Sequence, residues 1–208
     1  MYEYPSIRNT RKIPCVEGIA FDKIDGSNFR AKWSFKSGFT LFGTRTQLVD
    51  GTTPYWNNVI DLFQQTIAES LHQSLSDNFR DEKQAIVFSE FYGENSFAGR
   101  HVEERHKLIT FDIYLEKSKK FLLPQDFIKF TKEADIEIPR VVYRGKNDAA
   151  LVVQVRKDEF NTPEGIIFKG SKRVGNFSGG VLMCKIKTFA YMDKLKQVFK
   201  DDWEKYSE

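Results

Sequence analysis

The segment from Lys23 to Asn28 combines the residue types that a lysine nucleophile requires. A lysine stands where a strand is predicted to end, and Gly26 follows in a turn that can hold the lysine toward a cavity. A neutral lysine is a nucleophile, and partial burial or a neighbouring cation favours the neutral form over the ammonium ion. The pattern KxDG alone also fits a surface lysine in a hairpin, so the interpretation depends on the rest of the chain.

Four later segments of the sequence support the interpretation of Lys23 as a nucleophile. They are residues 88–93, 110–113, 163–169 and 183–187. With the Lys23 segment they resemble, in order and spacing, motifs I, III, IIIa, IV and V of the covalent nucleotidyltransferases, which include ATP-dependent DNA ligases, RNA ligases and mRNA-capping guanylyltransferases. The resemblance spans Lys23 to Lys187. It implies an ATP-grasp-like adenylation domain of the α+β class, with mostly antiparallel sheets and flanking helices, and a covalent lysyl-nucleotide on Lys23.

The resemblance also implies roles for single residues. Glu90, on an apolar strand where a carboxylate needs a partner, matches a glutamate that accepts hydrogen bonds from the ribose; the alternative is a structural salt bridge. Phe111 matches an aromatic that stacks on the purine, and the alternative is core packing. Asp112 is expected to brace the fold. Glu164 matches a residue that helps to place a divalent metal on the phosphates, and Mg²⁺ takes few protein carboxylates.

Lysines are expected to contact the phosphates. Period two places Lys185 and Lys187 on one strand face, where both can neutralise phosphate charge. We assign Cys184 to the same face. The resemblance implies Lys169 as a further contact, and ATP with Mg²⁺ or Mn²⁺ as cofactors. Without the other motifs, a solvated strand face would explain the lysine pair.

The branch of the superfamily is indicated by Asn28. DNA ligases of the cellular type usually carry arginine at this position, whereas KxxGxN is the pattern of the RNA ligase 2-like branch. Arg45 adds support, since that branch has an arginine there, and both residues are implied contacts to the nucleotide, the 5′-phosphate and the nick. Capping enzymes match less well, because their motif V carries a Trp-Lys pair and they require a downstream oligonucleotide-binding domain.

A basic loop follows motif III. It spans residues 96–105 and carries Arg100, His101 and Arg105. We hypothesise that it contacts the polynucleotide backbone. A solvated charged loop is the equal alternative.

The elements that position these residues are predicted from hydrophobic periodicity. Residues 18–36 predict two strands around a turn, the second with an apolar face in and a basic face out, and residues 39–42 predict a returning antiparallel strand. Further strands are predicted at 85–92, 108–115, 165–169 and 181–187, and helices behind Thr52-Thr53-Pro54, at 122–134, behind Asn147 and from residue 189 to about 206.

Composition excludes several classes. The chain has 208 residues, of which 40% are hydrophobic and 29% are charged. This composition is typical of an ordinary globular protein. No apolar run approaches the roughly 20 residues of a membrane span, and no GxGxxG or P-loop pattern occurs. The two cysteines and three histidines show no metal-binding spacing. A net charge of +3 neither proves nor excludes a nucleic-acid partner, and the 14% aromatic content suits both cores and base stacking.

We therefore expect a cytoplasmic ATP-dependent RNA ligase, in the host cytoplasm if a virus or phage encodes it. The expected partner is a nicked RNA duplex or an RNA/DNA hybrid, with no membrane. Rival hypotheses are a minimal ATP-dependent DNA ligase, a GTP-using capping-type enzyme, and a degenerate binding module without activity.

The expected organisation is an adenylation domain at residues 1–188, with a C-terminal helix at 189–208 packed on it and no OB-fold. An accessory protein or an oligomer would then take the place of the second domain when a strand is sealed.

Overall fold

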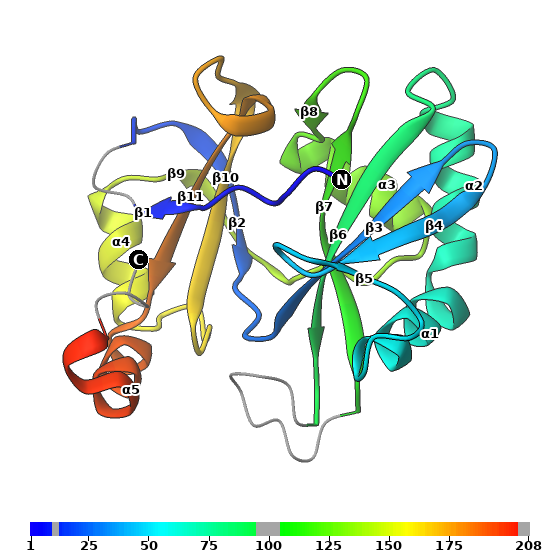
Figure 1. Ribbon diagram of the computed structural model, residues 1–208. Coiled ribbons are helices and arrows are strands. Elements are labelled where there is room, and N and C mark those ends of the chain that lie inside the picture. Colours follow the sequence, from blue (N-terminus) through cyan, green and yellow to red (C-terminus); the bar gives the residue numbers. More distant parts are fainter. Residues whose placement is uncertain (10–12, 95–104, 204–208) are drawn as a thin grey trace. The chain divides into compact units, whose positions relative to one another are not determined.

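The computed structural model describes residues 1–9, 13–94 and 105–203. These residues form two compact units, each built around its own sheet (Figure 1). The first unit comprises Met1–Tyr4, Asp25–Leu122 and Asp126–Ile138, and the second comprises Pro5–Ile24, Leu123–Gln125 and Pro139–Glu208. The prediction of an α+β fold with mostly antiparallel sheets is confirmed.

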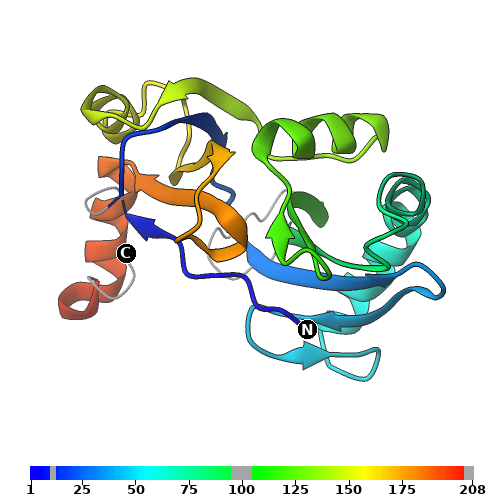
Figure 2. The same cartoon turned by 90° about the horizontal axis from the view of Figure 1, so that it is seen from above.

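The first unit contains a six-stranded antiparallel sheet in the order β5-β4-β3-β6-β7-β8. Its strands are β3 (Ser27–Ser34), β4 (Gly38–Gly43), β5 (Leu48–Val49), β6 (Gln84–Tyr92), β7 (Lys107–Leu115) and β8 (Lys120–Phe121). Its helices are α1 (Trp56–Thr66), α2 (Ala68–Asn78) and most of α3 (Pro124–Glu133). Figure 2 shows α1 and α2 beside this sheet from above.

Side chains alternate between the two faces of β3, and the apolar ones pack against the helices that cover one face of the sheet. Phe29, Ala31 and Trp33 are fully buried on one face. The ring of Phe29 lies 5.5 Å from that of Phe63 in α1, and Trp33 Nε1 donates to His72 Nδ1 of α2 at 2.9 Å. The predicted apolar face is therefore confirmed.

The opposite face of β3 is not simply exposed. Arg30 is only 2% exposed, and its Nη1 donates to the carbonyl oxygens of Tyr2 at 2.8 Å and Met1 at 3.3 Å. The N-terminal segment Met1–Tyr4 lies on this face and supplies the acceptors that water would otherwise provide. The predicted basic face toward solvent is therefore wrong at Arg30.

The second unit contains a five-stranded sheet in the order β1-β11-β10-β2-β9. The strands are β1 (Arg8–Asn9), β2 (Glu17–Asp22), β9 (Val141–Lys146), β10 (Gly165–Arg173) and β11 (Val181–Lys187), and the helices are α4 (Ala149–Arg156) and α5 (Phe189–Phe199). All pairs are antiparallel except β1 with β11. Because β2 pairs with β9 and β10, it is not part of the antiparallel unit predicted for residues 18–36; β3 and β4 do form one.

The start of α1 differs from the prediction. The helix begins at Trp56, and Tyr55 at its N-cap position makes no side-chain capping bond. The hydroxyls of Thr52 and Thr53 instead donate to Asp50 Oδ1 at 2.7 and 3.2 Å. This local turn competes with helix capping for the same hydroxyl groups.

The start of α4 also differs. Asp148, not Asn147, is the N-cap, and its Oδ1 accepts from Leu151 N at 3.0 Å. Asn147 accepts from Val16 N at 2.6 Å and donates to Pro14 O at 3.0 Å. Its amide therefore fixes the chain ahead of β2 rather than the helix.

No helix within residues 1–9, 13–94 and 105–203 has both the length and the apolar character that crossing a membrane demands.

Candidate active site

Lys23 directly follows β2 and forms an ion pair with Glu164. Its Nζ lies 2.6 Å from Glu164 Oε1, and its backbone N donates to Gly165 O at 3.0 Å. Lys23 is 25% exposed at its side chain, whereas Glu164 is only 4% exposed. The end of β2 therefore holds the lysine against a buried carboxylate.

The backbone beside Glu164 depends on a glycine. Gly165 has φ of +138°, and a Cβ atom there would collide with Ile186 O and lie 2.7 Å from Lys187 Cα. Only glycine permits this conformation and this approach of β10 to β11. This approach brings Nζ of Lys187 to 3.9 Å from Glu164 Oε1. The same carboxylate oxygen therefore pairs with both Lys23 and Lys187.

Cations gather on one face of the β2-β10-β11 sheet. Cross-strand partners point to the same face, and Lys185 pairs with Ile167, which pairs with Phe21. By the same alternation Lys187 and Lys169 lie on this face. Lys169 is 3% exposed, and its Nζ lies 5.3 Å from the ring centroid of Phe21. We call this surface the lysine face.

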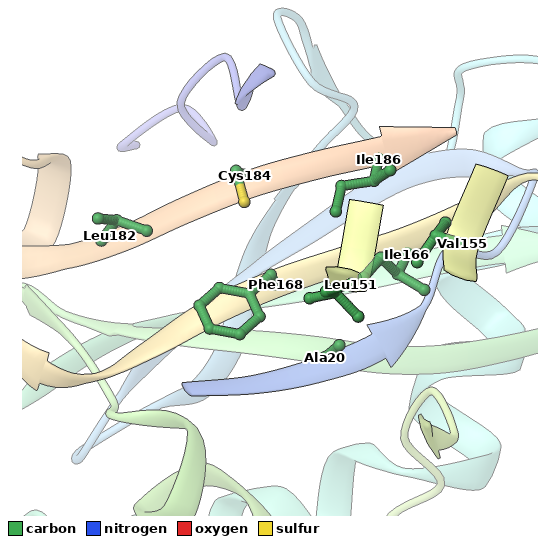
Figure 3. Close-up of a cluster of buried hydrophobic side chains, with 8 residues drawn as sticks. All are labelled: Ala20, Leu151, Val155, Ile166, Phe168, Leu182, Cys184 and Ile186. Carbon is green, nitrogen blue, oxygen red and sulfur yellow. The ribbon is translucent and has the colours of Figure 1, made fainter. Parts of the chain in front are cut away.

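The opposite face of the sheet is apolar. Leu182, Cys184 and Ile186 of β11 pack with Leu151 and Val155 of α4 in a buried cluster, shown in Figure 3. The assignment of Cys184 to the lysine face is therefore wrong, because residue 184 has the opposite parity to the lysines. Burial raises the pKa of the Cys184 thiol to about 12.

A second cation anchors the strand end before Lys23. Arg140 O accepts from Asp22 N at 2.8 Å, and Arg140 Nη2 donates to Asn161 O at 2.7 Å and lies 3.5 Å from Asp22 Oδ2. Burial raises the pKa of Asp22, and the Arg140 guanidinium opposes this shift. Arg140 was not predicted as part of the site, because it lies outside every motif segment of the sequence.

The side chains around Glu164 are better suited to binding a phosphate than to surrounding a metal ion with protein ligands alone. Four lysines lie on or beside a face with one buried carboxylate, and several ammonium groups stabilise phosphate oxygens. Within the described ranges, no group of three or more His, Cys, Asp or Glu side chains could hold a metal ion. One carboxylate does fit Mg²⁺, which is commonly bound through one or two carboxylates plus substrate phosphates and water.

The first unit contributes a separate group of predicted residues. Asn28 of β3 is the cross-strand partner of Glu90 of β6, so both lie on one face, and Glu90 is half-buried. Gly26 fits closely against β6, where a Cβ atom would lie 2.5 Å from Phe91 O. Asn28 Oδ1 is buried and has no hydrogen-bond partner among the described residues. An unpaired buried acceptor is unfavourable unless a ligand donates to it.

Phe111 occupies an irregularity of β7. Phe88 pairs with Asp112 and Ser89 pairs with Thr110, so Phe111 is the extra residue of a β-bulge. Its half-buried ring lies 6.3 Å from that of Phe88. The expected bracing role of Asp112 has a structural basis, since Asp112 is buried and accepts a 2.6 Å hydrogen bond from the Tyr4 hydroxyl.

Two of the predicted basic residues, Arg45 and Arg105, lie outside the helices and strands. Arg45 is exposed in the turn after β4, which Thr44 N closes by donating to Gln47 O at 2.8 Å. Of the basic loop, Arg105 is exposed, whereas Arg100 and His101 lie outside the described residues.

The predicted site residues thus fall into two groups. The second unit brings together Lys23, Glu164, Lys169, Lys185 and Lys187. The first unit pairs Asn28 with Glu90 and carries Phe111 and Arg45. The roles of these residues stay predictions.

The comparisons with known proteins identify the family. The RNA ligase family model matches residues 17–187, which is most of the chain. The chain belongs to the RNA ligase family. Comparison with curated protein sequences gave no match.

Solved RNA ligases share the fold of this RNA ligase family member. An archaeal ATP-dependent RNA ligase has 15% identity and a TM-score of 0.67 over 96% of this chain and 52% of its own. A Naegleria gruberi RNA ligase mutant with AMP and Mn has 15% identity and a TM-score of 0.68 over 93% and 58%. A second mutant of that enzyme, with ATP and Mn, has 16% identity and a TM-score of 0.65 over 86% and 52%. The chain spans about half the length of these ligases.

Proposed function

We propose that the chain is the adenylation part of an ATP-dependent RNA ligase that forms a lysyl-AMP intermediate and seals nicks between a 5′-phosphate and a 3′-hydroxyl. The observation that carries the proposal is the Lys23–Glu164 pair beside the lysine face. Membership of the RNA ligase family supports it, as do solved relatives that contain ATP or AMP with Mn.

The first step follows from the chemistry of Lys23. Its Nζ, after losing a proton, attacks the α-phosphorus of ATP, so that a P–N bond forms and the bond to pyrophosphate breaks. Lys169, Lys185 and Lys187 offset the charge of the phosphates during this transfer. Glu164 would hold Mg²⁺ or Mn²⁺, which supplies further charge neutralisation on the phosphate oxygens.

The later steps use the other predicted contacts. The AMP passes from Lys23 to a 5′-phosphate, and a 3′-hydroxyl then attacks that phosphate and releases AMP. Asn28 and Arg45 are the proposed contacts to the 5′-phosphate, and Glu90 and Phe111 bind the ribose and adenine. Positioning and charge neutralisation account for the catalysis.

We further propose an organisation, a substrate, a partner and a location for the protein. They are an adenylation domain at residues 1–188 with a C-terminal helix at 189–208, a nicked RNA duplex or RNA/DNA hybrid as substrate, help from an accessory protein or oligomer, and a cytoplasmic location.

The test is covalent labelling followed by sealing. The wild-type protein and Lys23→Arg are incubated with α-labelled ATP, GTP or dATP. The matched control is Lys129→Arg, at an exposed lysine of α3. We expect an ATP-dependent adduct in the wild type and control, and none in Lys23→Arg, because arginine stays protonated. An adduct that survives Lys23→Arg would refute Lys23 as the nucleophile, and a GTP-only adduct would indicate a capping-type enzyme.

The same preparations are then offered nicked duplexes of RNA, of DNA and of hybrids. We expect sealing of RNA-containing nicks. Sealing of DNA alone would indicate a minimal DNA ligase, and a protein that neither labels nor seals would be a binding module.

A further inference from the structure

We propose that Tyr4 is a positioning residue for Phe111, so that the N-terminal segment Met1–Tyr4 belongs to the base-recognition part of the nucleotide site. This inference rests on the proposed function, in which Phe111 stacks on adenine. Its residues all lie in the first unit.

The ring of Tyr4 braces Phe111 directly. The two ring centroids are 5.0 Å apart and the planes are inclined by 85°, an edge-to-face contact. Tyr4 contacts Phe88 in the same way, at 5.0 Å and 60°. Phe88 in turn lies 6.3 Å from Phe111, so the three rings contact one another. This arrangement restricts the orientation of the Phe111 ring.

The hydroxyl of Tyr4 holds the backbone that carries Phe111. It donates to Asp112 Oδ2 at 2.6 Å, and both side chains are buried. Burial, aided by the neighbouring Asp112 carboxylate, raises the pKa of Tyr4 well above its usual value, so the hydroxyl stays protonated as the donor. Because Phe111 and Asp112 are consecutive residues of the bulge, this bond fixes the segment from which the Phe111 ring projects.

Other contacts anchor the segment independently of Tyr4. Arg30 donates to the carbonyl oxygens of Met1 and Tyr2, and Tyr2 stacks on Tyr114 with ring centroids 4.0 Å apart and planes inclined by 4°. The Tyr2 ring also contacts Phe121, at a centroid distance of 6.1 Å, whereas the Tyr4 ring contacts Phe111 itself. Tyr2→Leu is therefore the matched control, because it removes a ring that anchors the same segment and leaves the Tyr4–Phe111 contact in place.

If Tyr4 is lost, the Phe111 ring is no longer held in one orientation, and this should change the kinetics in a specific way. Base stacking favours a ring that is already oriented, whereas the lysine face binds phosphate without the base. Losing Tyr4 should therefore weaken ATP binding through the base alone. The maximum rate of lysyl-AMP formation should change little, because the reacting atoms lie at the phosphates.

The kinetic test measures single-turnover lysyl-AMP formation against ATP concentration. For Tyr4→Leu we expect about a tenfold rise in the half-saturating ATP concentration with the maximum rate within about twofold. The inhibition constant of inorganic tripolyphosphate should not change. Tyr4→Phe should show a smaller rise, and Tyr2→Leu none. Equal effects of Tyr4→Leu and Tyr2→Leu, or a lower maximum rate at unchanged half-saturation, would overturn the proposal.

A second measurement is independent of ligation. 4-Fluorophenylalanine is placed at position 111, and its fluorine NMR resonance is compared between the wild type and the same three variants. We expect the resonance to move in Tyr4→Leu and Tyr4→Phe but not in Tyr2→Leu; an unmoved resonance in both Tyr4 variants would refute the positioning role. If Tyr4→Leu does not fold, Tyr4→Phe alone decides. If the wild type forms no adduct with any nucleotide, the proposed function fails, while the resonance still decides the role of Tyr4.

Discussion

Nζ of Lys23 lies 2.6 Å from Oε1 of Glu164, and that carboxylate is buried. The same oxygen lies 3.9 Å from Nζ of Lys187, so one carboxylate is shared by two lysines of the lysine face. In a site that binds phosphates, this carboxylate determines how much positive charge the face carries.

Replacing Glu164 by glutamine should reduce adenylylation through the proposed metal. The substitution removes the proposed ligand of the divalent ion, and losing one contribution to the stabilisation of developing charge costs about 10²–10³ in rate in other enzymes. The measurement is the rate of lysyl-AMP formation at saturating Mg²⁺. Glu159→Gln, an exposed carboxylate of the same unit, is the control. Equal rates for the two variants would remove Glu164 from the mechanism.

Gly165 should be intolerant of alanine. At φ of +138° an added Cβ meets the backbone of Ile186 and Lys187, which cannot move aside as a flexible side chain could. We expect Gly165→Ala to lower the free energy of unfolding by about 2–4 kcal/mol. Gly51→Ala is the matched control, because a Cβ there meets nothing within 4 Å, and it should change stability by less than about 0.5 kcal/mol. Urea denaturation measures both, and similar stability of the two variants would contradict the described approach of β10 to β11.

The raised pKa of Tyr4 predicts a loss of stability at high pH. Above pH 10.0, the ordinary value, Tyr4 ionises in the unfolded chain but keeps its proton in the folded one, so stability falls as pH rises. The slope contributed by this group approaches about 1.4 kcal/mol per pH unit. Tyr4→Phe should lose this component, and the two stability curves should be parallel below pH 9 and converge above pH 10. Curves that stay parallel up to pH 11 would show that the Tyr4 hydroxyl is not buried.

The two cysteines should differ sharply in reactivity. Cys15 is exposed and Cys184 is buried in the cluster under α4, with its pKa raised to about 12. Since the thiolate is the reactive form, roughly one Cys184 side chain in 10⁴ is ionised at pH 8. We expect iodoacetamide to label one cysteine per native chain and two in denaturant, as counted by mass spectrometry. Rapid labelling of both in the native protein would place Cys184 at the surface.

Periodic patterns predicted much of the fold. The strand predicted at residues 181–187 coincides with β11, and those predicted at 85–92 and 108–115 begin one residue inside β6 and β7. The helix predicted at 122–134 encloses α3. These elements each have one strongly apolar face, and such a face can be read from local spacing.

What the sequence did not reveal depends on partners distant along the chain. Arg30 looks like an exposed strand residue until the carbonyl oxygens of Met1 and Tyr2 reach it. The bulge at Phe111 is a register shift between β6 and β7, and no residue type encodes it locally. Tyr4 and Arg140 act through such contacts, so the candidate site was predicted in its motif residues but not in the residues that position them.

The division of the chain between the two units constrains how this protein can be dissected. The chain leaves one unit for the other after Tyr4, after Ile24, after Leu122, after Gln125 and after Ile138. Neither unit is therefore encoded by one continuous stretch of sequence, and no single cut yields an intact half. The crossing after Ile24 lies one residue beyond Lys23. The proposed nucleophile and Asn28 therefore belong to different units, although few residues separate them in the sequence. A gene fragment that retained every motif but lacked the first four codons would still remove part of the first unit.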